Sequence, residues 1–213
     1  MNFLRKYWQD LGIAVALIVG LSLYVEWQNI TEIRAILWVS FVAILLHQFE
    51  EYRWPGYFGG LFNVLIFNSE YPQRYPLNPQ SAMIINLVIA YVFYLLPVLF
   101  PDVIWLGLAP ILMGFFQFIW HGIFANIKGK TLYNPGLFAV IFLHIPVGCW
   151  YIDHIVSHSL VTTVDWVAGT IYFIIAVYVL IIKGNMWLKD KGARYSFSKQ
   201  QMGPYGRGVV RGE

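Results

Sequence analysis

Two long stretches of the sequence, 103–127 and 131–152, contain no Asp, Glu, Lys or Arg. Each is long enough to cross the hydrocarbon core of a bilayer, which takes roughly 20 mostly apolar residues in a helix. Of the 213 residues, 59% are hydrophobic and 12% are charged, about half the charged fraction of an average soluble domain. This composition excludes a soluble globular protein, a disordered chain, a collagen and a coiled coil.

Hydropathy and length together predict six membrane spans, at 9–27, 34–52, 82–100, 103–127, 133–152 and 164–183. We therefore predict an all-α integral membrane bundle of six transmembrane helices. Residues 1–187 form a single transmembrane domain, and residues 188–213 form a basic, flexible cytoplasmic tail. No small-residue cleavage site follows the first span convincingly, so we expect it to be retained as a helix. The single cysteine, Cys149, excludes an internal disulfide and a cysteine-rich metal site.

The basic residues gather on one side of this six-span arrangement. Thirteen of the 14 Lys and Arg fall on the side of the two termini, and only Arg34 falls opposite. The positive-inside rule makes that side cytoplasmic, so both termini are expected in the cytoplasm. Because the basic residues flank the spans instead of forming one patch, we interpret them as orientation signals and expect no nucleic-acid partner.

The connection between the second and third spans, 52–81, is unusually long. Its residues 55–67 are apolar but too short to cross a bilayer, which predicts a re-entrant or interfacial segment. Pro72, Pro76 and Pro79 then prevent a regular helix. We expect this connection to act as a lid or lateral gate on the cytoplasmic face; an amphipathic segment resting on the headgroups is the alternative.

Ionisable residues within the spans are the candidate functional residues, because each is costly in hydrocarbon unless it is paired or ligated. His47, Glu50 and Glu51 lie at i, i+3 and i+4 at the end of the second span, on one helix face. From the rise of 1.5 Å per residue, His47 lies roughly 8 Å, His121 roughly 9 Å and His144 roughly 15 Å below the same surface. We therefore expect the three histidines to converge with the two glutamates.

Imidazole nitrogens and carboxylate oxygens are the ligands expected for catalytic zinc or non-haem iron. We predict that His47, Glu50, Glu51, His121 and His144 bind one divalent metal ion, with zinc preferred over iron. Glu50 and Glu51 are also the candidate catalytic residues, because one carboxylate can ligate while the other acts as general base on a metal-bound water. This predicts a metal-dependent membrane enzyme, a hydrolase, that acts on a lipid-soluble substrate at the cytoplasmic leaflet.

Two other functions use the same residues without a metal. Glu50 or Glu51, with a pKa raised by burial, could move a proton in the isomerisation or cyclisation of an apolar substrate, with His121 as its partner. Alternatively, His47, Glu50 and Glu51 could relay protons in a proton-coupled transporter. The absence of a polar path through the outer half of the spans argues against a transporter.

Structural roles are the further alternative for each polar group. The carboxylates of the second span could be solvated or paired with Arg53 or Arg74, and His121 or His144 could join helices by hydrogen bonds. Asn86 and Asn126 face the same leaflet and are candidate substrate-binding residues, with helix-to-helix hydrogen bonding as their alternative.

His154 and His158 are four residues apart at the outer end of the fifth span, beside Asp153. Water is near at this depth, so we interpret them as surface residues. A peripheral metal site is the alternative.

The string His47-Gln48-Phe49-Glu50-Glu51 resembles the motif of the HXXEE-domain family, multi-span membrane proteins without an established activity. Tyr75-Pro76-Leu77-Asn78 looks like a Tyr-Pro-x-Asn element of that family, and Tyr133-Asn134-Pro135-Gly136 is similar in style. The resemblance covers roughly residues 35–180. It implies a shared site on His47, Glu50 and Glu51, adds Tyr75 and Asn78 as candidate substrate-binding residues, and supplies no reaction. The family's His-x-x-x-Asn element is not matched, since four residues separate His121 from Asn126.

Overall fold

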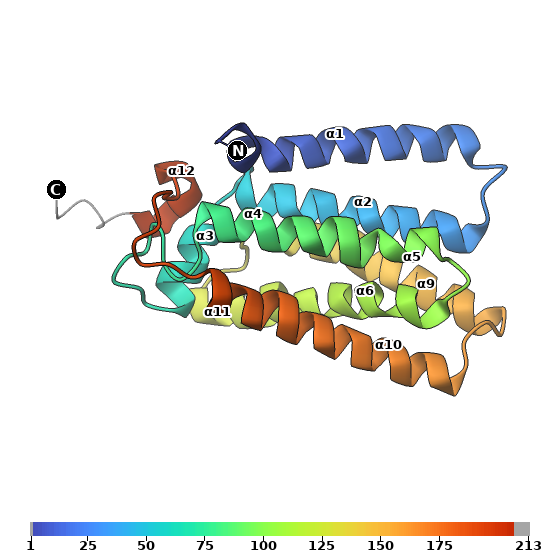
Figure 1. The fold of residues 1–213 in the computed structure, drawn as a ribbon. Coiled ribbons are helices and arrows are strands. Elements are labelled where there is room, and N and C mark those ends of the chain that lie inside the picture. Colours follow the sequence, from blue (N-terminus) through green and yellow to red (C-terminus); the bar gives the residue numbers. More distant parts are fainter. Residues whose placement is uncertain (1, 207–213) are drawn as a thin grey trace.

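The computed structural model describes residues 2–206. Six of its helices are long and apolar enough to cross a membrane, and they lie side by side as a bundle (Figure 1). These spans are Phe3–Glu26, Glu32–Tyr52, Pro79–Leu99, Ile104–Gly129, Leu137–Ser157 and Thr163–Leu188. The described residues contain no β-strand. The prediction of an all-α, multi-pass membrane bundle of six helices is confirmed.

The first two spans are single α-helices, α1 (Asn2–Glu26) and α2 (Glu32–Tyr52). Each of the other four combines α-helical segments with a π-helical one. In chain order these are α4 (Pro79–Val88), η2 (Ile89–Tyr94) and α5 (Leu96–Leu99); α6 (Ile104–Gln117), η3 (Phe118–Ala125) and α7 (Asn126–Gly129); α8 (Leu137–Ala139), η4 (Val140–His144) and α9 (Ile145–Ser157); and α10 (Thr163–Ala176), η5 (Val177–Lys183) and α11 (Gly184–Leu188). π-Helical turns are rare and occur frequently at functional sites.

The helices extend beyond the predicted spans at several ends, because hydropathy detects only the apolar part of a helix. The third span, predicted from residue 82, begins at Pro79. There the Asn78 side chain accepts hydrogen bonds from the backbone N–H groups of Gln80 and Ser81, which caps the helix. Proline at the first helical position suits the same start, because its fixed φ is already helical.

Helix α2 lies at the centre of the bundle. In the apolar 18-residue stretch of this helix 61% of the residues are buried, against 17% in the corresponding stretch of the sixth span. Phe41 shares one hydrophobic cluster with Phe93 and Met113, while Leu37 shares another with Tyr151. Polar residues near the end of α2 are therefore surrounded by side chains of other helices.

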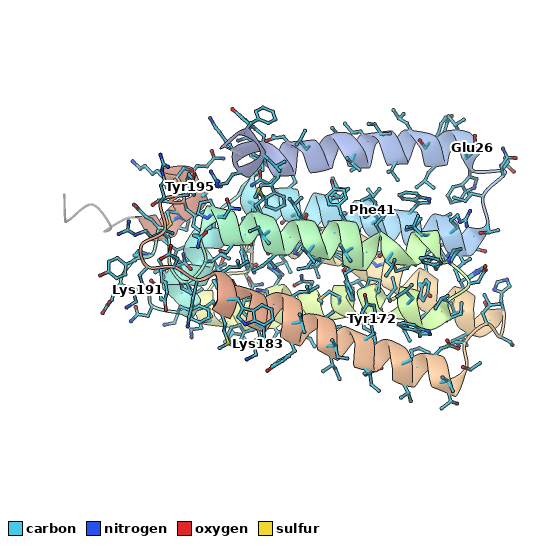
Figure 2. All side chains as sticks on the ribbon, viewed as in Figure 1. Glu26, Phe41, Tyr172, Lys183, Lys191 and Tyr195 are labelled. Carbon is cyan, nitrogen blue, oxygen red and sulfur yellow. The ribbon has the colours of Figure 1, made fainter. Side chains whose placement is uncertain are left out.

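The outer faces of the bundle are apolar. Large side chains such as Leu17, Leu21, Ile171 and Ile174 are exposed on the first and sixth spans. An apolar surface this extensive is expected where helices contact lipid, so the bundle fits a bilayer environment. Figure 2 shows Lys191 and Tyr195 at the end of the bundle that carries α12 (Lys199–Met202), and Glu26 at the opposite end.

The apolar part of the long connection folds into α3 (Phe58–Gly60) and η1 (Leu61–Ile66), at the end of the bundle next to α12 (Lys199–Met202) (Figure 1). Phe58 and Phe62 are buried in a cluster with Tyr52. The Phe58 ring also lies 5.8 Å from the ring of His121. This segment therefore covers the polar residues of α2 from one end, and its re-entrant or interfacial path stays a prediction.

The chain beyond α11 packs on the same end of the bundle, through α12 and the 3₁₀ turn η6 (Gly203–Gly206). Phe197 is 3% exposed and Met202 is 1% exposed, and both belong to the cluster that contains Phe58. The Arg5 guanidinium lies over the Tyr195 ring, 3.3 Å from its centre. Apolar side chains from the chain beyond α11 thus complete that cluster, while most other described residues of this segment are exposed or half-buried. Residues 207–213 lie outside the described residues.

Candidate metal centre at the end of the second helix

The last two turns of α2 place three polar side chains inside the bundle. His47 is 1% exposed, Glu50 8% and Glu51 5%. The i, i+4 spacing puts His47 and Glu51 on one face, with His47 Nε2 3.6 Å from Glu51 Oε1. α2 therefore supplies one imidazole and one carboxylate to a common site.

His121 joins this pair from η3 of the fourth span. Its Nε2 lies 3.4 Å from Glu51 Oε1, and its ring centre lies 5.0 Å from that of His47. One possible ligand atom from each of His47, Glu51 and His121 lies within 4.8 Å of the others, and all three residues are buried. Two imidazoles and a carboxylate are the donor set of one class of catalytic zinc site.

Asn134, which is fully buried, fixes the orientation of His121. Its side-chain amide donates to the His121 carbonyl at 2.8 Å and to Asn126 Oδ1 at 2.7 Å. Because a backbone carbonyl only accepts, this contact identifies the nitrogen of Asn134. Its Oδ1 therefore faces His121 Nδ1, at 2.6 Å, and His121 Nδ1 must donate. In the neutral imidazole, Nε2 then carries the lone pair and directs it at Glu51.

The π-helical turn explains how His121 and Asn126 contact the same asparagine. On an ideal α-helix, residues five apart point about 140° away from each other. In η3 (Phe118–Ala125) the repeat is longer, since π-helical hydrogen bonds join residues five apart, and such residues share nearly one face. Asn134 can therefore contact both residues.

The Glu51 carboxylate lies against the imidazoles of His47 and His121, which carry a positive charge only when they are protonated. Among the described residues, both ring nitrogens of His47 and the Nε2 atoms of His121 and His144 are buried without a hydrogen-bond partner. Leaving a buried polar atom unsatisfied costs roughly 1–3 kcal/mol. A cation held by His47 Nε2, His121 Nε2 and the Glu51 carboxylate would satisfy two of these four nitrogens.

His144, on η4, lies beside this group of three residues. Its ring centre is 5.3 Å from that of His47, and the residue is 4% exposed. The close approach depends on Gly114, where a Cβ atom would lie 3.1 Å from His144 Nδ1. His144 thus contacts the centre but does not belong to the set whose ligand atoms lie within 4.8 Å.

Glu50, also predicted as a ligand and catalytic residue, binds the start of the fifth span instead. Its Oε1 accepts from the Tyr133 hydroxyl at 2.8 Å and from the Phe138 N–H at 3.1 Å, and its Oε2 accepts from the Ala139 N–H at 2.8 Å. A carboxylate is favourable at the N-terminal turn of a helix, where backbone N–H groups are free. Burial raises the pKa of Tyr133, and its hydrogen bond to Glu50 raises it further. Both carboxylate oxygens of Glu50 are therefore occupied by the protein itself.

A cavity of about 290 Å³ opens beside Glu51. Its walls are mostly apolar and include Phe62, Phe116, Trp120 and Ile181. A second cavity of about 840 Å³ shares Phe62, Trp120 and Ile181 with the first and reaches Lys189 and Lys191. The two cavities therefore adjoin, and the inner one brings mostly apolar walls to the Glu51 side chain.

The predicted substrate-binding residues fall into two groups. Asn86 lines the inner cavity and Tyr75 lines the outer one. Asn78 caps α4, and its amide donates to the Leu188 carbonyl at 3.2 Å. Asn126 accepts from Asn134. Asn86 and Tyr75 thus line cavities, while Asn78 and Asn126 make hydrogen bonds within the fold, as does the Asn86 amide, which donates to the Ala82 carbonyl at 2.9 Å.

Two residues that contact the site, Asn134 and Gly136, were not predicted as site residues from the sequence. Gly136 has φ +104°, and a Cβ atom there would lie 2.6 Å from His121 Cε1. The available signal was the string Tyr133-Asn134-Pro135-Gly136, in which an asparagine and a glycine directly precede an apolar span.

Comparison with known proteins supplies a family and no activity. The family model described as a protein of unknown function with HXXEE motif matches residues 38–151. No curated protein matches the sequence. No solved structure matches it either. The matched region covers more than half of the chain and contains His47, Glu51, His121 and Asn134, so the chain belongs to the HXXEE family of multi-span membrane proteins.

Proposed function

We propose that this protein is a metal-dependent integral membrane enzyme, a hydrolase, that acts on a lipid-soluble substrate. His47, His121 and Glu51 would hold one divalent ion, with zinc preferred over iron because zinc accepts a tetrahedral set of two imidazoles and a carboxylate. The observation that carries the proposal is the position of His121 Nε2, which faces Glu51 Oε1 at 3.4 Å and has no hydrogen-bond partner among the described residues.

The distances suit an ion after small adjustments. Ligand atoms bound at about 2.0 to 2.2 Å around a tetrahedral zinc lie roughly 3.3 to 3.6 Å from one another. The His121–Glu51 and His47–Glu51 separations are 3.4 and 3.6 Å. Asn134 supplies the second hydrogen bond that metal-binding histidines usually make at their other ring nitrogen.

The substrate class follows from the cavity beside Glu51. A cavity of about 290 Å³ with mostly apolar walls suits an acyl or isoprenoid chain better than a polar metabolite. Asn86, at its wall, would orient a polar group of the substrate.

Hydrolysis also requires a group that moves a proton, and His144 suits this role better than Glu50. Glu50 accepts three hydrogen bonds at the start of the fifth span, whereas His144 lies beside His47 with its Nε2 free of partners among the described residues. His144 would accept a proton from water as the water oxygen attacks the substrate, and would return it to the leaving group.

The same observation supports a second candidate, in which a proton takes the place of the metal. His121 would then be an imidazolium paired with Glu51, and the pair would serve as general acid and base in the isomerisation or cyclisation of an apolar substrate. Metal content separates the two candidates.

We also propose that both termini lie in the cytoplasm. The support is the charge distribution: thirteen of the 14 Lys and Arg fall on the side of the two termini in the six-span arrangement, and Figure 2 shows Lys191 at the end of the bundle near α12 and Glu26 at the opposite end. This orientation would open the site toward the cytoplasmic leaflet.

The metal is tested first. Full-length protein is purified in detergent without chelators, and its zinc and iron are counted by mass spectrometry. We expect the metal of this centre to be lost in His121→Ala and Glu51→Gln, but kept in Glu50→Gln, the matched carboxylate on the same helix turn. Equal metal content in all four proteins would contradict the metal proposal and leave the acid–base pair.

Hydrolysis is tested without knowing the substrate. The protein is incubated with cell lipid extract in water enriched in oxygen-18, and the lipid products are analysed by mass spectrometry. Hydrolysis should place the heavy oxygen in one product, at a rate that falls at least a hundredfold in Glu51→Gln. Products that form without the label would indicate isomerisation or cyclisation instead.

A further inference from the structure

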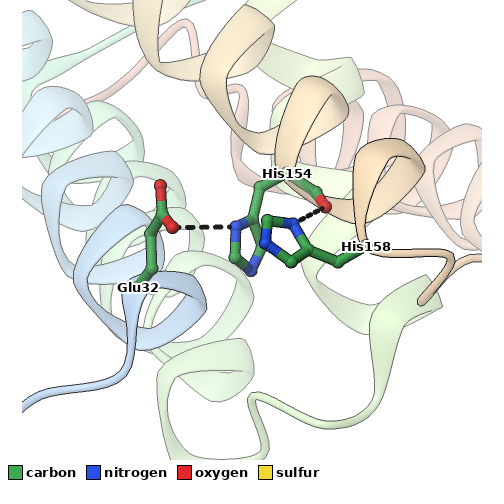
Figure 3. Close-up of side chains that lie close together, drawn as sticks. All are labelled: Glu32, His154 and His158. Atoms are coloured by element: carbon green, nitrogen blue, oxygen red, sulfur yellow. Dashed lines mark hydrogen bonds and ion pairs between the residues drawn. The ribbon is translucent and has the colours of Figure 1, made fainter.

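A second group of possible metal ligands lies at the opposite end of the bundle from His47 and Glu51. Glu32 occupies the first turn of α2, while His154 and His158 lie at the end of α9 (Figure 3). Fifteen residues separate Glu32 from His47 on α2, or roughly 22 Å at 1.5 Å per residue. One ion therefore cannot serve both groups.

The three side chains converge. His154 Nδ1 lies 3.2 Å from Glu32 Oε2, and the ring centres of His154 and His158 are 4.4 Å apart. One possible ligand atom from each residue lies within 4.8 Å of the others. The i, i+4 spacing of the two histidines on one helix face is the spacing with which helices present a histidine pair to zinc.

Hydrogen bonds orient two of the three groups. His158 Nδ1 lies 3.0 Å from the His154 carbonyl, which only accepts, so Nδ1 donates and Nε2 carries the lone pair (Figure 3). The Trp150 indole N–H donates to Glu32 Oε1 at 2.8 Å, which leaves Oε2 on the side of His154. In metal sites, the ligand atoms that do not bind the ion typically make hydrogen bonds of this kind.

His154 is 8% exposed, and its Nδ1 has no partner with hydrogen-bond geometry among the described residues despite its nearness to Glu32. This nitrogen points toward the carboxylate but is misaligned for a hydrogen bond with it. Such an arrangement is expected where both atoms face a third atom that lies between them. The end of α9 also favours a cation, because the carbonyl groups of a helix C-terminus carry partial negative charge.

We propose that Glu32, His154 and His158 form a second metal site, for zinc or a similar divalent transition metal. The site joins the start of α2 to the end of α9, and it leaves at least one coordination position to water because His158 and Glu32 are partly exposed. It does not depend on the proposed hydrolase. By binding only the folded bundle, the ion stabilises the packing of α2 on α9.

The test is a two-by-two comparison of bound zinc in full-length protein equilibrated with zinc at a low micromolar free concentration. Relative to the unmodified protein, His158→Ala should lose one ion per chain. His121→Ala should lose one ion from the inner centre, which is the proposed site of His47, Glu51 and His121. The double variant should lose both. Asp153→Asn is the matched control, because Asp153 is exposed beside His154 but absent from the group.

Each failure has its own signature. If His158→Ala and Glu32→Gln bind as much zinc as the unmodified protein, the second site is overturned, whatever His121→Ala shows. If only His121→Ala binds an unchanged amount, the inner centre fails and the second site stands. As an independent readout, zinc should raise the Tm of Asp153→Asn as it does in the unmodified protein, and should raise it less in Glu32→Gln.

Discussion

His121 is the residue on which the proposed inner metal centre depends most, because its two ring nitrogens have different environments. Nδ1 faces Asn134 Oδ1 at 2.6 Å, and Nε2 faces Glu51 Oε1 at 3.4 Å. The hydrogen bond at Nδ1 fixes the tautomer of the ring and raises the basicity of Nε2. Asn134 is therefore a positioning residue, although it need not touch an ion or a substrate.

Asn134→Ala should weaken zinc binding at this centre by about 10- to 100-fold, the usual effect of removing such a hydrogen bond. The measurement is competition with a zinc-binding dye in the His158→Ala background, which removes the proposed second site. Asn63→Ala is the matched control, since Asn63 is equally buried and donates to the Pro72 and Leu77 carbonyls, away from the centre. It should lower stability while leaving the zinc affinity unchanged; equal loss of affinity in both variants would contradict the role of Asn134.

Gly136→Ala should displace the His121 ring for two reasons, a steric clash and a strained backbone conformation. The new Cβ would lie 2.6 Å from His121 Cε1, and φ is +104°, a region that L side chains rarely adopt. We expect a loss of about 1–3 kcal/mol in stability and of metal from the inner centre. In the control Gly20→Ala, no atom lies within 4 Å of the new Cβ, and stability should rise or stay the same. A Gly136→Ala protein with normal metal content would contradict this packing.

At the scale of elements, two features hold the site together: the carboxylate of Glu50 at the start of the fifth span and the π-helical turns in the fourth and fifth spans. Glu50 ties the end of α2 to the backbone N–H groups of Phe138 and Ala139. η3 carries His121 and η4 carries His144. The neighbouring carboxylates of the HXXEE motif thus have separate tasks, since Glu50 fixes the helix arrangement and Glu51 faces the histidines.

Glu50→Gln should lower the free energy of unfolding by about 1–3 kcal/mol, because hydrogen bonds to a charged acceptor become weaker neutral ones. The expected result is a lower Tm in detergent with the metal retained. Glu51→Gln should show the reverse pattern, with metal loss as its main effect. Metal loss in Glu50→Gln at a temperature where the protein is folded would show that Glu50 is a ligand after all.

The hydrogen bond from the Tyr133 hydroxyl to Glu50 should make the stability of the protein depend on pH. Its folded-state pKa is raised by burial and by Glu50, so its neutral form stabilises the fold fully below its ordinary value of about 10. That stabilisation is lost as pH rises through the higher folded-state pKa. The difference in stability between the unmodified protein and Tyr133→Phe should therefore shrink at alkaline pH, as measured by denaturant unfolding at neutral pH and above pH 10. A difference that stays constant would contradict the hydrogen bond to Glu50.

At the scale of the whole molecule, the two ends of the bundle differ in chemistry. One end carries the inner centre and the packed segments α3 and α12, while the other carries the start of α2 and the end of α9, where Glu32 and the histidine pair lie (Figure 1). In the proposed orientation, with both termini in the cytoplasm, the inner centre would face the cytoplasmic leaflet and the proposed second site would face the opposite compartment.

Cysteine accessibility tests this orientation. Cys149 is the only cysteine, so a Cys149→Ala background allows single cysteines to be introduced at Asp102 and Lys128, at opposite ends of the bundle. A thiol reagent that does not cross membranes should label Asp102→Cys in intact cells, and Lys128→Cys only after the cells are permeabilised. The opposite pattern would reverse the orientation, and labelling of both in intact cells would contradict the six-span topology.

The sequence by itself determined the six spans and the pairing of His47 with Glu51, because both depend on short-range properties. An apolar run of sufficient length must form a helix in lipid, and residues four apart on a helix must share a face. Only the tertiary structure decided which side chains of other helices meet that face, since the rotation of each helix about its own axis is set by packing along its whole length. Packing brought His121 to Glu51, left His144 beside them, turned Glu50 to the fifth span and, through a π-helical turn, let His121 and Asn126 share Asn134.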